Sequence, residues 1–276
     1  VVLVPDPAYP IHRAGPILAG AEIYELPLTP AGGYLPDLDA IPPTVLNRAK
    51  AIVLNYPANP TTAVADAAFF AELARWAAHW GIWVIHDAAY SELAFDGLRP
   101  PSFLEAPGAI EVGIEFNSLS KTFNLAGCRI GYAVGNETLV RALKEIKGHL
   151  DYGTFLPIQR AAAFALRQPL EAARAAATVY QRRRDALVEA LAAIGWDVPP
   201  PRATMFCWAP LPSGHTDSRG FALTLMERAG VIVTPGVGFG AGGEGFVRIA
   251  LVQDEERLRE AAARIAESGL LRPVRA

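Results

Sequence analysis

The feature that most constrains the fold is a strand, a helix and a second strand that follow one another between residues 51 and 85. Residues 51–54 (Ala-Ile-Val-Leu) and 82–85 (Ile-Trp-Val-Ile) are short apolar runs typical of central strands. Between them, Asp66 stands at a helix N-cap, apolar residues recur at helical spacing, and Gly81 ends the segment. Because such a crossover is almost always right-handed, we expect the two strands to lie parallel and to end at the same edge of one sheet, where ligands bind.

The remaining chain divides into two parts. Strands are predicted at residues 1–4, 112–116 and 130–134 in the first part, and at 204–208, 231–233 and 246–250 in the second. An Ala- and Arg-rich segment without a breaker, residues 170–195, predicts one long surface helix, and further helices are predicted near 218–229 and 254–267. Six glycines among residues 236–245 predict a loop.

This pattern predicts an α/β fold. We expect a large domain over residues 1–170, with a mostly parallel sheet flanked by helices, and a smaller α+β domain over residues 171–276 that is entered through the long helix. Residues 1–4 already have the character of a strand and Val1 is not an initiator methionine, so we expect the chain to begin inside a domain.

Composition excludes several classes of protein. Of the 276 residues, 51% are hydrophobic and 19% are charged, which excludes disorder for most of the chain. A net charge of −3 without long basic runs gives no electrostatic support for a nucleic-acid or membrane-surface partner. Cys128 and Cys207 lie far from any ligand spacing, so we predict no disulfide framework, no metal site and a cytoplasmic location.

Polar residues follow the ends of both strands in the first unit. Asn59 comes in a Pro-rich segment after residues 51–54, and its amide is expected to face the sheet edge, although a simple Asn-capped turn is an equally good interpretation. Asp87 follows residues 82–85 and, at the end of a buried strand, needs a cation or a donor as partner. The alternative is that Asp87 caps a following helix. His86 is interpreted as a core histidine.

A third polar segment follows the strand at 112–116. Ser118, Ser120, Lys121 and Arg129 combine hydroxyl donors, an ammonium and a guanidinium, a set that can hold a phosphate. A lysine whose pKa is depressed could also act as a Schiff-base nucleophile. A surface-loop lysine is the alternative.

Taken in order, these motifs resemble the cofactor signature of the class I and II aminotransferases of fold type I, which use pyridoxal 5′-phosphate. The resemblance rests on Asn59-Pro-Thr, Asp87-x-x-Tyr90, Ser118-x-Ser-Lys121, Arg129 eight positions later, and Arg248 in Gly-Phe-Val-Arg-Ile-Ala. Each motif alone is weak to moderate. The five in sequence, over residues 5–251, are specific.

The resemblance implies a role in cofactor binding for each residue of the first part. Lys121 would form the Schiff base and then move the substrate Cα proton, and Asp87 would pair with the pyridinium nitrogen. Asn59 and Tyr90 would hydrogen-bond the phenolic oxygen of the cofactor. Ser118 and Arg129, with Ser120 as a weaker candidate, would bind the phosphate.

Two further residues are implied at the ring and at the substrate. Tyr9, in Asp-Pro-Ala-Tyr-Pro, matches the aromatic residue that stacks on the cofactor ring, with a turn tyrosine as the alternative. Arg248 matches the arginine that holds the substrate α-carboxylate by a two-point contact, with Asn59 beside it.

Within the family, residues 86–136 most resemble LL-diaminopimelate aminotransferases and their aspartate- and alanine-type relatives. This implies amino-group transfer from such an amino acid to a 2-oxo acid such as 2-oxoglutarate, a part in lysine biosynthesis, and a homodimer. Two alternatives stay open. One is another pyridoxal phosphate enzyme, such as a C–S lyase or a decarboxylase, and the other is a non-catalytic truncated relative.

The sequence departs from the family pattern in two places. Family members carry a further N-terminal segment with a glycine-containing, phosphate-binding turn before the motif at residues 5–7, so the resemblance implies an N-terminally truncated chain. Thr62 stands where the family usually has glycine, which is expected to tighten that turn while leaving Asn59 in place.

Overall fold

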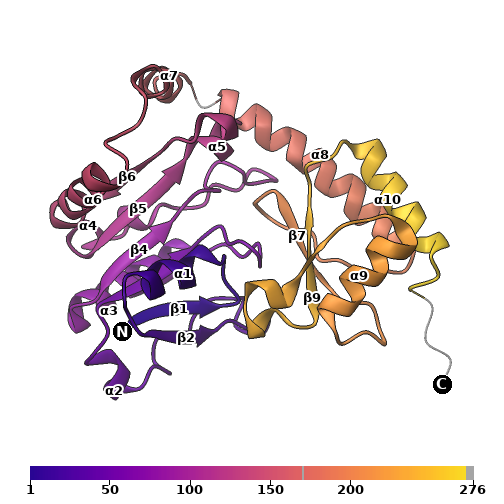
Figure 1. The fold of residues 1–276 in the computed structure, drawn as a ribbon, viewed down its shortest axis with the longest axis horizontal. Helices are drawn as coiled ribbons and strands as arrows, with labels where there is room; N and C mark the ends of the chain where they lie inside the picture. The colour runs from indigo at the N-terminus through magenta and orange to yellow at the C-terminus, as the bar shows by residue number, and fades with distance from the viewer. Residues whose placement is uncertain (170, 272–276) are drawn as a thin grey trace.

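The structure, a computed structural model, describes residues 1–169 and 171–271 and has two lobes (Figure 1). We call the part from β1 to α7 the large lobe and the part from α8 to α10 the small lobe. A six-stranded sheet forms the centre of the first and a three-stranded sheet the centre of the second. Helix α8 runs along the top of the view from one lobe to the other.

The large-lobe sheet is mostly parallel, as predicted. Its strands are β1 (Val2–Asp6), β2 (Ile23–Pro27), β3 (Ala51–Asn55), β4 (Trp83–Asp87), β5 (Gly113–Ser118) and β6 (Gly131–Gly135). The order is β2-β1-β3-β4-β5-β6, and only β6 runs antiparallel to its neighbour. Asn55 lies opposite Asp87 in the register of β3 and β4, so these two strands end side by side.

Helices cover the sheet and connect its strands. They are α1 (Ile11–Leu18), α2 (Pro43–Leu46), α3 (Ala67–Trp80), α4 (Ala109–Val112), α5 (Leu119–Thr122), α6 (Glu137–Leu150) and α7 (Leu156–Leu166), with 3₁₀ turns η1 (Phe103–Glu105) and η2 (Ala126–Cys128).

Helix α3 forms the predicted crossover between β3 and β4. The Asp66 carboxylate accepts a hydrogen bond from the Phe69 amide at 2.8 Å, and Gly81 ends the helix in the left-handed conformation. Phe70 and Leu73 are buried in the core between the helix and the sheet. Each such side chain stabilises the fold by about 1.5–3 kcal/mol relative to an exposed one.

The small lobe is built on an antiparallel sheet. Its elements are α8 (Glu171–Ala193), β7 (Phe206–Pro210), α9 (Ser218–Ala229), β8 (Thr234–Pro235), η3 (Gly236–Phe239), η4 (Ala241–Gly243), β9 (Phe246–Ala250) and α10 (Glu255–Glu267). The strand order is β7-β9-β8. Leu191, Trp196, Leu225 and Val247 lie in its core.

Several boundaries differ from those expected. Residues 109–112 form α4, so β5 begins at Gly113 rather than at residue 112. Residues 231–233 do not form a strand: they line a cavity that α10 also borders, and β9 pairs with Thr234 and Pro235 instead. Strand β7 begins at Phe206 rather than at residue 204.

Strand β2 was not anticipated, because only Leu26 of its five residues is buried and its apolar signal is therefore weak. The start of the predicted long helix, Leu170, lies outside the described residues. The division of the chain into domains at residues 170 and 171 stays a prediction.

In the described part of the chain, no helix combines the length and the apolarity that a membrane span requires. Within the same residues, no group of three or more His, Cys, Asp or Glu side chains is placed to hold a metal ion.

Candidate active site

Most candidate site residues of the large lobe lie where β3, β4 and β5 end, while Tyr9 follows β1 and Arg129 precedes β6. Asn59 follows β3, Tyr90 follows β4, and Lys121 lies on α5 directly after β5. The glycine-rich segment of the small lobe touches the end of β1, and Arg248 on β9 reaches Asn59. Parallel strands that end at one edge therefore gather the large-lobe residues opposite the small sheet.

Asp87, the last residue of β4, has a partner that the sequence did not identify. His12 on α1 is buried, and its Nε2 lies 3.0 Å from Asp87 Oδ2. The Ala89 amide donates to Asp87 Oδ1 at 3.2 Å, and residues 89–92 form turns rather than a helix. The interpretation of Asp87 as a helix cap is therefore wrong. Its carboxylate is oriented by an imidazole and a backbone amide.

A sequence signal for His12 was available but weak. His12 comes three residues after Tyr9, in the segment that follows β1, and any residue there lies near the strand ends. In the structure the Tyr9 ring lies edge-on to the His12 ring, with centroids 5.8 Å apart. Tyr9 itself is 42% exposed at the edge of the sheet. An exposed aromatic ring that packs on His12, the partner of Asp87, is available to stack on a planar ligand.

Lys121 is half-buried. Burial lowers the pKa of its ammonium, the guanidinium of Arg129 lowers it further, and the carboxylate of Asp87 opposes both effects. The amine is therefore unprotonated in a larger fraction of molecules near neutral pH than an exposed lysine would be. An unprotonated amine is the form that attacks a carbonyl carbon.

The two serines and Arg129 occupy different environments. Ser118 lines a largely apolar cavity of about 620 Å³ whose polar wall includes His12, Asp87 and Asn117. Ser120 is buried and is not among the residues that line this cavity. Arg129 is exposed, and its Nη1 donates to the Ala126 carbonyl at 3.0 Å. Ser118 and Asp87 thus line the same cavity, while Arg129 acts on the site through the effect of its positive charge on the pKa of Lys121.

The loop after β3 is held to β4 by Asn55. Its amide donates to the Asp87 carbonyl at 2.7 Å, and its side-chain oxygen accepts from the Asn59 amide at 2.7 Å. Thr62 adopts a left-handed backbone with φ of 61°, a conformation that favours glycine. This turn therefore keeps the backbone shape that a glycine would allow, and Asn59 stays at the sheet edge.

Asn59 joins the two lobes. Its side-chain oxygen accepts a hydrogen bond from Arg248 Nη1 at 2.8 Å. Tyr90 lies beside it: burial and the charge of Asp87 raise the pKa of the phenol, and the positive charge of Arg248 and a hydrogen bond with Asn59 oppose that rise. Asn59, Tyr90 and Arg248 are thus brought together from three segments far apart in the sequence.

Arg248 lies between two aromatic rings. Its guanidinium carbon is 4.1 Å from the centroid of Phe206 and 4.7 Å from that of Phe239. Nη2 lies 3.4 Å from Thr234 Oγ1, while the buried Nε has no partner in the described part of the chain. Burial lowers the pKa of the guanidinium. A half-buried cation that meets only neutral groups there is well suited to receive a carboxylate.

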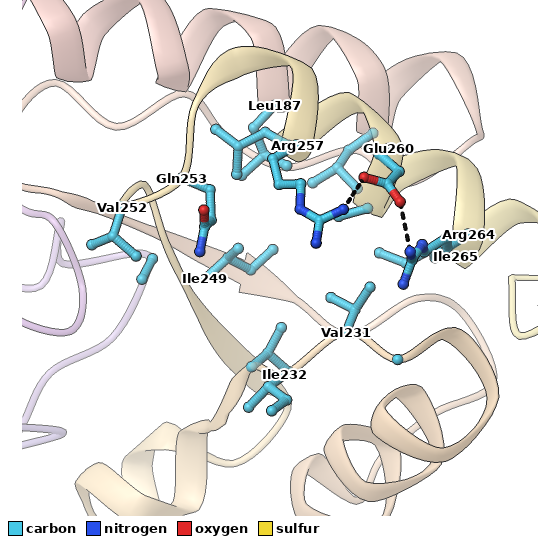
Figure 2. A pocket seen from close by; sticks show the side chains of 16 residues that line it. Leu187, Val231, Ile232, Ile249, Val252, Gln253, Arg257, Glu260, Arg264 and Ile265 are labelled. Atoms are coloured by element: carbon cyan, nitrogen blue, oxygen red, sulfur yellow. Dashed lines mark hydrogen bonds and ion pairs between the residues drawn. The ribbon is translucent and has the colours of Figure 1, made fainter.

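A second cavity, of about 320 Å³, lies in the small lobe between α8, α10 and β9 (Figure 2). Its walls are mostly apolar, and Glu260 bridges Arg257 and Arg264 at its rim, with N···O distances of 2.5 and 2.6 Å. None of the residues expected to act in catalysis lines it. The chemistry is therefore assigned to the edge of the large sheet.

Comparison with known proteins gives one family. The profile described as "Aminotransferase class I and II" matches residues 1–265. The LL-diaminopimelate aminotransferase of Moorella thermoacetica is 51% identical over 263 residues, a match that covers 95% of this chain and 67% of that protein. The chain thus spans about two thirds of the length of this relative.

Two solved structures have the same fold. The apo form of BacF from Bacillus subtilis superposes with a TM-score of 0.94 at 44% identity, covering 98% of this chain and 72% of that one. A probable N-succinyldiaminopimelate aminotransferase from Thermus thermophilus gives a TM-score of 0.90 at 43% identity, covering 97% and 71%.

Proposed function

This chain belongs to the class I and II aminotransferases, and from that premise we propose that it moves the amino group of LL-diaminopimelate, or of an aspartate- or alanine-like amino acid, to a 2-oxo acid such as 2-oxoglutarate. The observation that carries the proposal is Arg248, a half-buried guanidinium that meets no carboxylate in the described residues and reaches across the lobes to Asn59. Every amino acid and 2-oxo acid carries the carboxylate that this group can receive.

The residues of the large lobe fit pyridoxal 5′-phosphate as the cofactor. Asp87, fixed by His12, offers a carboxylate for a ring nitrogen, and Lys121 offers an amine whose pKa is lowered. Ser118 and Arg129 offer a hydroxyl and a guanidinium for a phosphate, with Ser120 as a weaker candidate. Asn59 and Tyr90 would donate to the phenolic oxygen, and Tyr9 would stack on the ring.

When bound, pyridoxal phosphate supplies an electron-withdrawing ring that weakens the Cα–H bond of the substrate. The chain's own residues then do three things. Arg248 would bind the α-carboxylate and so orient the substrate. Lys121 Nζ would accept the proton that leaves Cα of the amino acid and, in the second half-reaction, deliver a proton to Cα of the amino acid formed from the 2-oxo acid. The Asp87 carboxylate, oriented by His12, would accept a hydrogen bond from a protonated ring nitrogen of the cofactor. Phe206 and Phe239 exclude water from the guanidinium.

The proposal extends to assembly and location. Tyr152, Phe155 and Phe164, near and on α7, are exposed by 96, 70 and 67%. Large exposed apolar side chains of this kind mark interaction surfaces and support a homodimer.

Cys128 and Cys207 are both free thiols, which supports a reducing, cytoplasmic location.

The test is an assay of the purified chain with pyridoxal phosphate, 2-oxoglutarate and one amino donor at a time. We expect glutamate to form fastest with LL-diaminopimelate, more slowly with aspartate and alanine, and about 10²–10⁴-fold more slowly with Lys121→Ala. Release of ammonia, sulfide or carbon dioxide without glutamate would instead assign a lyase or a decarboxylase. If glutamate forms with aspartate or alanine but not with LL-diaminopimelate, the amino donor is an aspartate- or alanine-like amino acid.

A further inference from the structure

Asp6, the last residue of β1, is a buried carboxylate with no part in the site described above. Only 8% of its surface is exposed. Oδ2 accepts a hydrogen bond from the Gly242 amide at 3.0 Å, and Oδ1 has no partner in the described part of the chain. Burial raises the pKa of this carboxyl group. Because burying a carboxylate without partners costs folding free energy, its position at the end of β1 requires a contact that offsets this cost.

That contact is with the glycine-rich segment 236–245 of the small lobe. Gly240 has φ of 124°, and a side chain there would overlap Asp6 Oδ1. A Cβ on Gly242 would lie 2.8 Å from the Asp6 carbonyl oxygen. The segment also folds on itself, because a Cβ on Gly236 or Gly243 would overlap the carbonyl oxygen of the other. Residues without a Cβ at positions 240 and 242 therefore allow the backbone of this segment to approach Asp6 so closely.

The same segment positions Phe239. The Ala8 amide donates to the Phe239 carbonyl at 2.9 Å. Ala8 comes two residues after Asp6, and Phe239 directly precedes Gly240. Phe239 is buried, its ring lies against the guanidinium of Arg248, and its centroid is 5.9 Å from that of Trp208. The segment after β1 thus fixes the backbone of Phe239, whose ring packs on Arg248.

We propose that Asp6 is a positioning residue for Arg248: it anchors segment 236–245 to the large lobe and thereby fixes Phe239 against the guanidinium that receives the substrate carboxylate. The inference rests on the proposed function for the role of Arg248, but the anchor itself can be tested without it. Asp6 is not among the residues assigned to the substrate or the cofactor, and its contacts with the small lobe are to Gly240 and Gly242, so its effect passes through this segment.

The kinetic test compares wild type with Asp6→Ala and Asp6→Asn. Loss of a hydrogen bond to a charged group should raise the KM of both the amino acid and the 2-oxo acid about tenfold in Asp6→Ala. We expect kcat to change by less than about twofold, because Lys121 and Asp87 lie on other strand ends. Asp6→Asn keeps the side-chain size and one acceptor, so its KM values should rise in parallel but by less.

The matched control is Asp254→Ala, which removes the carboxylate that caps α10 by accepting from the Arg257 amide. It should lower the melting temperature and leave both KM values unchanged. If Asp6→Ala and Asp6→Asn behave like this control, or if the KM of a carboxylate-free amine rises as much as the KM of the amino acid, Asp6 has only a structural role and the inference is overturned.

Amide hydrogen exchange provides a readout that does not depend on activity. In Asp6→Ala we expect faster exchange over residues 236–245 and unchanged exchange in α10. Unchanged exchange over 236–245 would overturn the anchor, whether or not the chain transaminates. Failure of wild type to form any glutamate would overturn the proposed function, and the exchange result would still decide the anchor.

Discussion

The two lobes contribute to the site in different ways. The large lobe presents most of its site residues at or just after the ends of β3, β4 and β5, with one polar segment at each strand end. The small lobe presents one, Arg248, from the middle of β9, and its position depends on Phe206, Phe239 and Asn59. Parallel strands of one sheet end at the same edge, so the residues at their ends lie close together whatever the other lobe does. A side chain in the middle of a strand, such as Arg248, reaches the site only when contacts with the other lobe fix its position.

This difference separates two tasks. Proton transfer is assigned to Lys121 and Asp87 in the large lobe, and recognition of the carboxylate to Arg248 in the small lobe. Substitutions of Lys121 and Asp87 should therefore act mainly on kcat, and substitutions that displace Arg248 mainly on substrate binding.

The largest effect is expected from Lys121→Ala. Removing the group that moves the Cα proton should slow the half-reaction with an amino acid by about 10²–10⁴-fold. Single-turnover absorbance measurements give the rate, and borohydride reduction followed by mass spectrometry shows whether the cofactor is attached at residue 121. A reducible adduct that persists in the variant would assign the attachment to another lysine, such as Lys144 or Lys147.

Asp87→Asn should have the next largest effect. An amide retains the shape of the carboxylate but cannot carry its charge opposite His12. The loss of a hydrogen bond to a charged group, about 1.5–3 kcal/mol, corresponds to a rate lower by roughly tenfold to 150-fold. The half-reaction rate and the melting temperature should be compared. A lower melting temperature with unchanged turnover would contradict the assigned role.

Arg248→Lys should weaken substrate binding and leave the chemical step nearly unchanged. Lysine keeps the charge but cannot reproduce the planar two-point contact, so kcat/KM for amino acid and 2-oxo acid should fall by roughly tenfold to a few hundredfold. A carboxylate-free amine serves as the control substrate and should be nearly unaffected. Equal losses on all three substrates would place Arg248 among the residues that merely support the fold.

Arg129→Gln tests the electrostatic link to Lys121. The guanidinium lowers the pKa of the Lys121 ammonium, so its removal should raise that pKa. The pH midpoint for capture of pyridoxal phosphate by Lys121 should then move upward, and capture at neutral pH should slow. Absorbance at a series of pH values follows the reaction. A downward or absent shift would mean that Arg129 lies too far away to act.

The smallest effect on turnover is expected from Asp66→Ala. Asp66 resembles Asp87 in residue type but caps α3, where it accepts from the Phe69 amide. Its loss should cost about 0.5–2 kcal/mol of unfolding free energy and leave kcat/KM unchanged. Urea unfolding and steady-state kinetics measure the two quantities. Lower activity at equal stability would contradict the distinction between the two carboxylates.

Much of the large lobe could be predicted from local patterns. Short apolar runs, the Asp66 cap and Gly81 defined the crossover between β3 and β4, and polar residues after each run indicated Asn59, Asp87 and Lys121. Edge elements were harder. Strand β2 buries only one of its five residues, and residues 231–233 have the apolar character of a strand but line a cavity instead.

The sequence by itself determined which residues follow which strands, because strand and helix formation depend on neighbours along the chain. Only the tertiary structure decided which of these residues meet. His12 reaches Asp87 across 75 positions, Arg248 reaches Asn59 across 189, and Gly242 reaches Asp6 across 236. Such pairs leave no periodic signal, because their distance is set by how sheet, helix and lobe pack together rather than by spacing in the chain.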